Sequence, residues 1–98
     1  LSYHTQGQLI YWNFDDIEVP GALALGREFA RLSGYSLENT PYASGFAGYK
    51  DWFIKAFRRP GFTIEAGLGE NPLPLEQFDT IYLNNLGILT TAALGLPE

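Results

Sequence analysis

The sequence contains no cysteine, no methionine and only one histidine among its 98 residues. Without cysteine, disulfide bonds and thiolate metal sites are excluded, but the compartment stays open because secreted bacterial and cytosolic proteins can both lack cysteine. The missing initiator methionine suggests a processed or excised segment of a longer protein. The first residues also lack the charged start and apolar stretch of a signal peptide.

Basic residues are few: six Lys and Arg stand against eleven Asp and Glu, a formal net charge of −5. This balance argues against nucleic acid as the main partner, because phosphate binding relies on a basic surface. Arg58 and Arg59 are interpreted as ordinary surface residues, and Asp15, Asp16 and Glu18 as solvated acids whose spacing matches no calcium loop. No apolar run approaches the ~20 residues of a membrane helix, so no membrane span is expected.

The pattern of apolar residues predicts strands that alternate with helices. Residues 7–14 (GQLIYWNF) and 62–66 (FTIEA) are rich in aromatic and β-branched residues, which favours strands. Apolar positions at steps of three and four predict an amphipathic helix that begins at Ala22 and ends at Gly34. Residues 35–49 are small, polar and interrupted by glycine and proline, and are predicted to form a loop.

Two further helices are predicted in the second half of the chain. Residues 49–57 (YKDWFIKAF) are expected to form a short helix with its aromatic side chains, Trp52, Phe53 and Phe57, facing inward. Residues 74–94 have a helical period that runs through Leu75, Phe78, Tyr82, Leu86 and Leu89. The second half of this segment is apolar almost all round, which is typical of a helix packed between other elements.

Alternating strands and helices predict the α/β class. Only two or three strands are available, however, and a nearly all-apolar helix and continuous apolar strands need cover on both faces. We therefore expect the chain to be part of a larger sheet.

Three side chains are candidates for chemistry. His4 precedes a strand pattern; a lone histidine is more often structural, but strand ends in α/β proteins are where ligands collect. Glu65 ends the FTIE strand. One interpretation is a solvated or capping group. The other is a general base, because the glycine-rich loop that follows leaves space beside the carboxylate. Tyr42 lies in a small-residue loop, where a tyrosine is usually a surface residue or a partial core anchor; the alternative is a phenol that covers a site.

The order SYHTQGQLIYW, YASG, KDWF and FTIEAG resembles the C-terminal part of zinc carboxypeptidases of the carboxypeptidase A type, over essentially all 98 residues. This resemblance implies a mixed sheet flanked by helices, with His4 as a ligand of a catalytic zinc, Tyr42 as a mobile substrate-covering residue and Glu65 as a catalytic residue. Lys50 lies near the matching specificity pocket, where it could receive a substrate carboxylate; a solvated lysine is the alternative. Ser2 departs from the family, which often has an acid two residues before the histidine.

The tail GENPLPLEQF resembles the bacterial branch that cleaves γ-D-glutamyl-diaminopimelate bonds in cell-wall peptides. In this family the other zinc ligands come from an upstream His-x-x-Glu motif, which this sequence does not contain. The resemblance thus implies that residues 1–98 are the C-terminal portion of one catalytic domain, with a cell-wall muropeptide as substrate and the N-terminal portion of the same domain as partner.

In the intact enzyme, the resemblance implies one zinc held by two imidazoles and one carboxylate, with a water at the open position. Glu65 would take the proton of that water and return it to the leaving amine, and the 98-residue segment alone would be inactive. Two alternatives remain. One is a non-catalytic peptide- or glycan-binding remnant of the same fold, and the other is a free-standing small α/β interaction domain.

Overall fold

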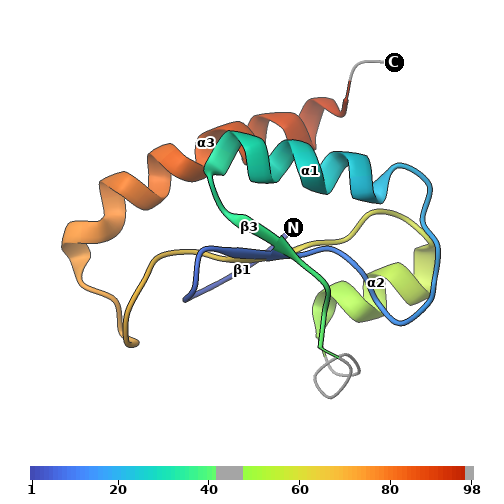
Figure 1. The fold of residues 1–98 in the computed structure, drawn as a ribbon, viewed down its shortest axis with the longest axis horizontal. Helices are drawn as coiled ribbons and strands as arrows, with labels where there is room; N and C mark the ends of the chain where they lie inside the picture. Colours follow the sequence, from blue (N-terminus) through green and yellow to red (C-terminus); the bar gives the residue numbers. More distant parts are fainter. Residues whose placement is uncertain (42–47, 97–98) are drawn as a thin grey trace.

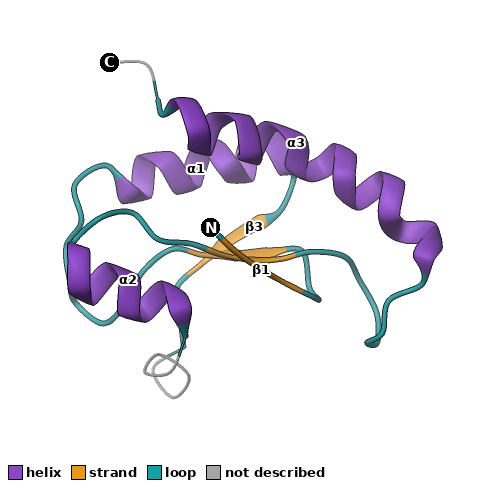
Figure 2. Ribbon diagram, turned by 180° about the vertical axis from the view of Figure 1, so that it is seen from behind, coloured by secondary structure: helices purple, strands orange, loops and turns teal. Residues whose placement is uncertain are grey.

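The computed structural model describes residues 1–41 and 48–96. A four-stranded mixed sheet lies between helices on both of its faces, so the predicted α/β class is confirmed. Figures 1 and 2 show α1 (Ala22–Ser33) and α3 (Phe78–Leu94) on one face and α2 (Tyr49–Phe57) on the other. Within the described ranges, no helix has the length and apolarity that crossing a bilayer requires.

The four strands are short, and each spans three residues: β1 (Ser2–His4), β2 (Leu9–Tyr11), β3 (Ser36–Glu38) and β4 (Thr63–Glu65). Their order in the sheet is β1-β4-β2-β3. β1 runs parallel to β4 and β2 parallel to β3, whereas β2 and β4 are antiparallel.

Two strand predictions need correction. The strand predicted over residues 7–14 is limited to Leu9–Tyr11, because β3 and β4 flank it only over those residues. The loop predicted over residues 35–49 contains β3. This strand could not be predicted because it is only three residues long and depends on pairing with β2. The strand predicted over residues 62–66 is confirmed in its central part as β4.

Helix α1 begins and ends where its sequence predicts. Gly34 follows its last residue with φ 77°, a left-handed conformation that suits glycine, and donates its N–H to the Ala30 carbonyl oxygen at 2.9 Å. The Ser33 hydroxyl donates to the Phe29 carbonyl oxygen at 2.8 Å, which gives this buried hydroxyl a partner.

Helix α2 has its predicted bounds, and Phe53 is half-buried, but the predicted inward orientation of Trp52 and Phe57 is wrong. Trp52 and Phe57 are 55% and 53% exposed, whereas Lys50 and Asp51 are each 4% exposed. The polar pair can be buried because the Lys50 ammonium is paired with the Asp51 carboxylate and donates to the Asn13 carbonyl oxygen at 2.5 Å. Trp52 and Phe57 are left at the surface.

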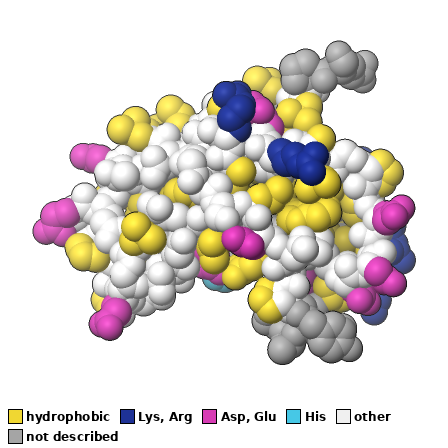
Figure 3. Space-filling view, viewed as in Figure 1, with side chains coloured by type: hydrophobic (Ala, Val, Ile, Leu, Met, Phe, Trp, Pro, Cys, Tyr) yellow, Lys and Arg dark blue, Asp and Glu magenta, His cyan; other side chains and the backbone are white. Residues whose placement is uncertain are grey.

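Helix α3 follows a short 3₁₀ turn, Leu75–Gln77, and the face that carries the predicted helical period is exposed within the described structure. All five side chains of that face are at least 41% exposed: Leu75, Phe78, Tyr82, Leu86 and Leu89. The other face, with Ile81, Asn85 and Ile88, is turned toward the sheet and α1. Apolar side chains therefore reach the surface over α3 (Figure 3).

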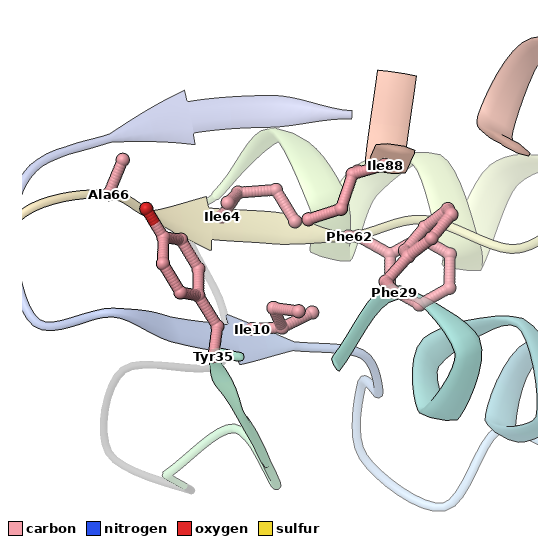
Figure 4. Close-up of a cluster of buried hydrophobic side chains, with 7 residues drawn as sticks. All are labelled: Ile10, Phe29, Tyr35, Phe62, Ile64, Ala66 and Ile88. Atoms are coloured by element: carbon pink, nitrogen blue, oxygen red, sulfur yellow. The ribbon is translucent and has the colours of Figure 1, made fainter. Parts of the chain in front are cut away.

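The hydrophobic core lies between the sheet and the layer formed by α1 and α3. Figure 4 shows its buried side chains converging from strands and helices: Ile10, Phe29, Tyr35, Phe62, Ile64, Ala66 and Ile88. The rings of Phe29 and Phe62 meet edge to face with their centroids 4.9 Å apart. Because Ile10 and Ile64 point into this core, their strand neighbours point to the opposite face of the sheet.

A buried amide joins α3 to the rest of the core. The Tyr3 hydroxyl donates to Asn85 Oδ1 at 3.1 Å, and Asn85 Nδ2 donates to the Tyr35 hydroxyl at 3.0 Å and to the Ile81 carbonyl oxygen at 2.9 Å. Burial, together with the nearby Tyr35, raises the pKa of Tyr3 to about 12. This network fixes β1 beneath α3.

We expect Asn85→Leu to lower the free energy of unfolding by about 1–3 kcal/mol, because the hydroxyls of Tyr3 and Tyr35 lose their shared partner. Urea unfolding measures the change. Asn84→Leu is the matched control, since Asn84 lies on the same helix and its side chain makes no hydrogen bond to another of the described residues. Equal losses in the two variants would contradict a specific role for Asn85.

Candidate active site

The pairing of β1 with β4 places His4 directly beside Glu65, its register partner on the neighbouring parallel strand. Each is the last residue of its strand, so both lie at the same end of the sheet. Side chains alternate between the faces along a strand. Tyr3 reaches α3 and Ile64 enters the core, so His4 and Glu65 both point to the face that carries α2. The structure brings together two candidates that are far apart in the sequence.

A cavity of about 340 Å³ on this face is lined by both His4 and Glu65. Its volume lies in the range of about 300–1,000 Å³ that is usual for small-molecule sites. The remaining lining residues come from β2, β4, the segment after β3 and the start of α2: Tyr11, Thr40, Pro41, Gly48, Tyr49, Lys50, Asp51 and Thr63. The cavity thus lies between the sheet and the beginning of α2.

A wider depression of about 710 Å³ lies between residues 12–21 and the start of α1. It holds acidic and apolar side chains, but neither His4 nor Glu65 lines it. We place the candidate site in the smaller cavity because an imidazole and a carboxylate both line it, and these groups can exchange protons and bind a metal.

The His4 imidazole is exposed, and its Nε2 lies 3.2 Å from Ser2 Oγ. Ser2 is two residues earlier on β1, so both side chains are on the same face of the strand. This hydrogen bond restrains the ring through Nε2. Nδ1 is then the nitrogen that can serve as a ligand.

Glu65 is half-buried, and its carboxylate makes no hydrogen bond to another of the described residues. Backbone hydrogen bonds hold the strand end that carries it. The Ala66 N–H donates to the His4 carbonyl oxygen at 2.8 Å, and the Gly7 N–H donates to the Gly67 carbonyl oxygen at 2.7 Å. A carboxylate on a backbone-anchored strand end beside an open cavity can act as a general base.

Lys50 lines the same cavity and is 4% exposed, so the alternative of a solvated lysine is wrong. Its two partners, the Asp51 carboxylate and the Asn13 carbonyl oxygen, were missed by sequence reasoning. A signal for Asp51 did exist: an acid at the third position of a helix commonly accepts a backbone N–H, and Asp51 accepts that of Gly48 at 3.3 Å.

Tyr42 lies outside the described residues, so its substrate-covering role stays a prediction. The segment that leads to it is described. Asn13 Oδ1 accepts the Thr40 N–H, and the Asn13 carbonyl oxygen accepts the Thr40 hydroxyl, both at 2.7 Å. Thr40 and Pro41, the last described residues before Tyr42, line the cavity.

The described residues can contribute to a metal site but do not complete one. Within 1–41 and 48–96, no group of three or more His, Cys, Asp or Glu side chains is placed to hold a metal ion. A catalytic zinc needs three protein ligands. His4 can supply one, and the others would have to come from outside the described part of the chain.

Comparison with known proteins gives two relatives, and no protein-family model matches the chain. The chain is 54% identical over 88 residues to gamma-D-glutamyl-L-diamino acid endopeptidase 1 of Lysinibacillus sphaericus, a match that covers 90% of this chain and 22% of that protein. It is 41% identical over 92 residues to the uncharacterized protein YqgT of Bacillus subtilis strain 168, covering 94% of this chain and 24% of that protein. The chain therefore spans less than a quarter of the length of these curated relatives, and it is similar to one part of a protein named as an endopeptidase.

Proposed function

We propose that this chain is part of a zinc-dependent peptidase that hydrolyses γ-D-glutamyl-diamino acid bonds in bacterial cell-wall peptides. The name of the relative that is 54% identical to it supports the substrate class. The observation that carries the proposal is the pairing of His4 with Glu65 at the ends of adjacent parallel strands, on the wall of one cavity.

Glu65 is the proposed general base and acid. Its carboxylate takes a proton from the attacking water and then delivers that proton to the nitrogen of the leaving amine. Both transfers need the carboxylate within hydrogen-bond reach of the reacting atoms. The strand end holds Glu65 in place, and the cavity beside it has room for a water and a substrate.

His4 is the proposed protein ligand that this chain contributes to one zinc ion in the intact enzyme. Zinc bound there would lower the pKa of a water to about 7 and polarise the scissile carbonyl group. The Ser2 hydroxyl, 3.2 Å from Nε2, orients the ring for that role. The remaining ligands are proposed to come from the N-terminal portion of the catalytic domain.

Lys50 and Tyr42 are the proposed substrate-binding residues. A γ-linked glutamyl residue keeps its α-carboxylate free, and an ammonium group can bind it. Lys50 has three N–H donors, and among the described residues two acceptors contact its Nζ. We assign the third donor to the substrate. Tyr42, which follows the cavity-lining Pro41 in the sequence, is proposed to cover the bound peptide.

The N-terminal portion of the same domain is the proposed partner of a surface formed by β1 and α3. Among the described strands, β1 pairs only with β4, so its outer edge offers unpaired backbone groups. Helix α3 has 17 residues, of which only Asp79 is charged, and its outer face exposes leucine and aromatic side chains. The relatives are more than four times as long as the matched region and so have ample chain to cover this surface.

A peptide-cleavage assay tests the proposed function. We expect the full-length protein, supplied with zinc, to cleave L-Ala-γ-D-Glu-meso-diaminopimelate between the glutamyl and diamino acid residues, and to leave the α-linked isomer intact. We expect the 98-residue chain alone to cleave neither. Chromatography of the products measures both. No cleavage by the zinc-loaded full-length protein would contradict the peptidase proposal, and cleavage by the short chain would contradict the proposed partner.

One observation favours the alternative of a peptide- or glycan-binding remnant. The exposed rings of α2 form a cluster, in which the ring centroid of Trp52 lies 5.6 Å from that of Tyr49 and 5.5 Å from that of Phe57. Exposed aromatic clusters often mark binding surfaces. The same assay separates the two functions, because a remnant would bind muropeptides without releasing a product.

A further inference from the structure

Two motifs that stand out in the sequence meet in the structure. Thr5 follows His4, and Asn71 belongs to the GENP stretch after Glu65. The Thr5 hydroxyl donates to Asn71 Oδ1 at 2.7 Å, and Asn71 Nδ2 donates back to the Thr5 carbonyl oxygen at 3.2 Å. Residues that are 66 positions apart are thus joined by hydrogen bonds in both directions.

The loop that carries Asn71 is held by other contacts as well. Gln77 Nε2 donates to the Leu68 carbonyl oxygen at 2.8 Å, and the Leu68 N–H donates to Gln77 Oε1 at 3.1 Å. Gly67 has φ 82°, and a Cβ added to it would lie 2.3 Å from Leu73 Cδ1. These contacts tie the loop rich in glycine and proline to the 3₁₀ turn that precedes α3.

The strands that carry His4 and Glu65 need such support. β1 and β4 are joined by only three register pairs, and β1 is an edge strand among the described strands. Ends of short edge strands open most easily. The Thr5–Asn71 contact lies beyond the last pair, where backbone bonds from Ala66 to His4 and from Gly7 to Gly67 also join the two segments, and it adds a side-chain link against this opening.

We propose that Thr5 and Asn71 form a clasp that keeps the ends of β1 and β4 in register. Both are positioning residues for the cavity that His4 and Glu65 line. Neither residue lines the cavity, so neither is assigned contact with the substrate. The consequence for catalysis rests on the proposed function. There, the clasp sets the separation of the His4 imidazole from the Glu65 carboxylate, and errors of about 1 Å can cost on the order of 10²-fold in rate.

Thr5→Val and Thr5→Ser in the full-length protein are a matched pair that tests the clasp. Valine keeps the shape of the side chain and removes the hydroxyl, whereas serine keeps the hydroxyl. We expect Thr5→Val to lower kcat about 10- to 100-fold with little change in KM, as is usual when the support of a site is lost, and Thr5→Ser to retain most of the activity. Asn71→Asp keeps an acceptor for the Thr5 hydroxyl but loses the donor to the Thr5 carbonyl oxygen. Its kcat should lie between those of Thr5→Val and Thr5→Ser.

Amide hydrogen exchange gives a readout that does not depend on activity. The Ala66 and Gly7 amides donate across the two strand ends, and we expect both to exchange faster in Thr5→Val but not in Thr5→Ser, with the amides of α1 unchanged. That pattern supports the clasp even if the full-length protein cleaves no peptide, which would count only against the proposed function. If the Ala66 and Gly7 amides of Thr5→Val exchange at the wild-type rate, the clasp is contradicted, whatever the value of kcat.

Discussion

Glu65→Gln in the full-length protein is expected to lower kcat by a factor of about 10²–10⁴ while zinc remains bound. Glutamine has nearly the same shape as glutamate, but its amide cannot take a proton from water. The fold should tolerate the change, because the Glu65 carboxylate makes no hydrogen bond to the described residues around it. Steady-state kinetics and metal analysis of the same preparation measure the two quantities.

Glu70→Gln is the matched control for this substitution. Glu70 is an exposed acid in the loop that follows Glu65, and it does not line the cavity. Its replacement removes the same charge from the same region and should leave kcat unchanged. Near-normal turnover in Glu65→Gln, or an equal loss in Glu70→Gln, would remove Glu65 from the proposed role.

His4→Ala is expected to reduce the zinc content from one ion per molecule to a small fraction of that after dialysis. A site that loses one of three protein ligands keeps too few bonds to hold zinc tightly. The exposed ring has only the Ser2 hydroxyl as a hydrogen-bond partner among the described residues, so the fold should survive its removal. Elemental analysis measures the zinc, and circular dichroism checks the fold.

Tyr3→Phe is the control for the histidine substitution. Tyr3 is adjacent on β1 but lies on the opposite face of the sheet, where it donates to Asn85. Its replacement perturbs the same strand without touching the cavity, and zinc content should not change. A full complement of zinc in His4→Ala would show that His4 is no ligand.

Helix positions could be predicted from the sequence because their determinants are local. The period of apolar residues and Gly34 define α1, and the same reasoning gives the bounds of α2. The faces of α2 and α3 could not be predicted in this way. The burial of Lys50 depends on a carbonyl group 37 residues away, and α3 is apolar on both sides, so periodicity does not distinguish its inner face.

The strands and the clasp depend on contacts that local sequence does not encode. A three-residue strand such as β3 can be recognised only from its pairing with a neighbouring strand, here β2. His4 and Glu65 were each ambiguous as single residues, and the order of the motifs around them raised them to candidates. Their register pairing, and the contact of Thr5 with Asn71, are properties of the folded chain.

The most direct test of the proposal that His4 and Glu65 act in one cavity is a crystal structure of the full-length protein grown with zinc. Anomalous diffraction would be recorded at the zinc edge. We expect one metal peak about 2.0–2.1 Å from a ring nitrogen of His4, and the Glu65 carboxylate within hydrogen-bond reach of a water in the same cavity. A zinc peak bound elsewhere, or a Glu65 side chain turned away from the cavity that His4 lines, would contradict the proposed site.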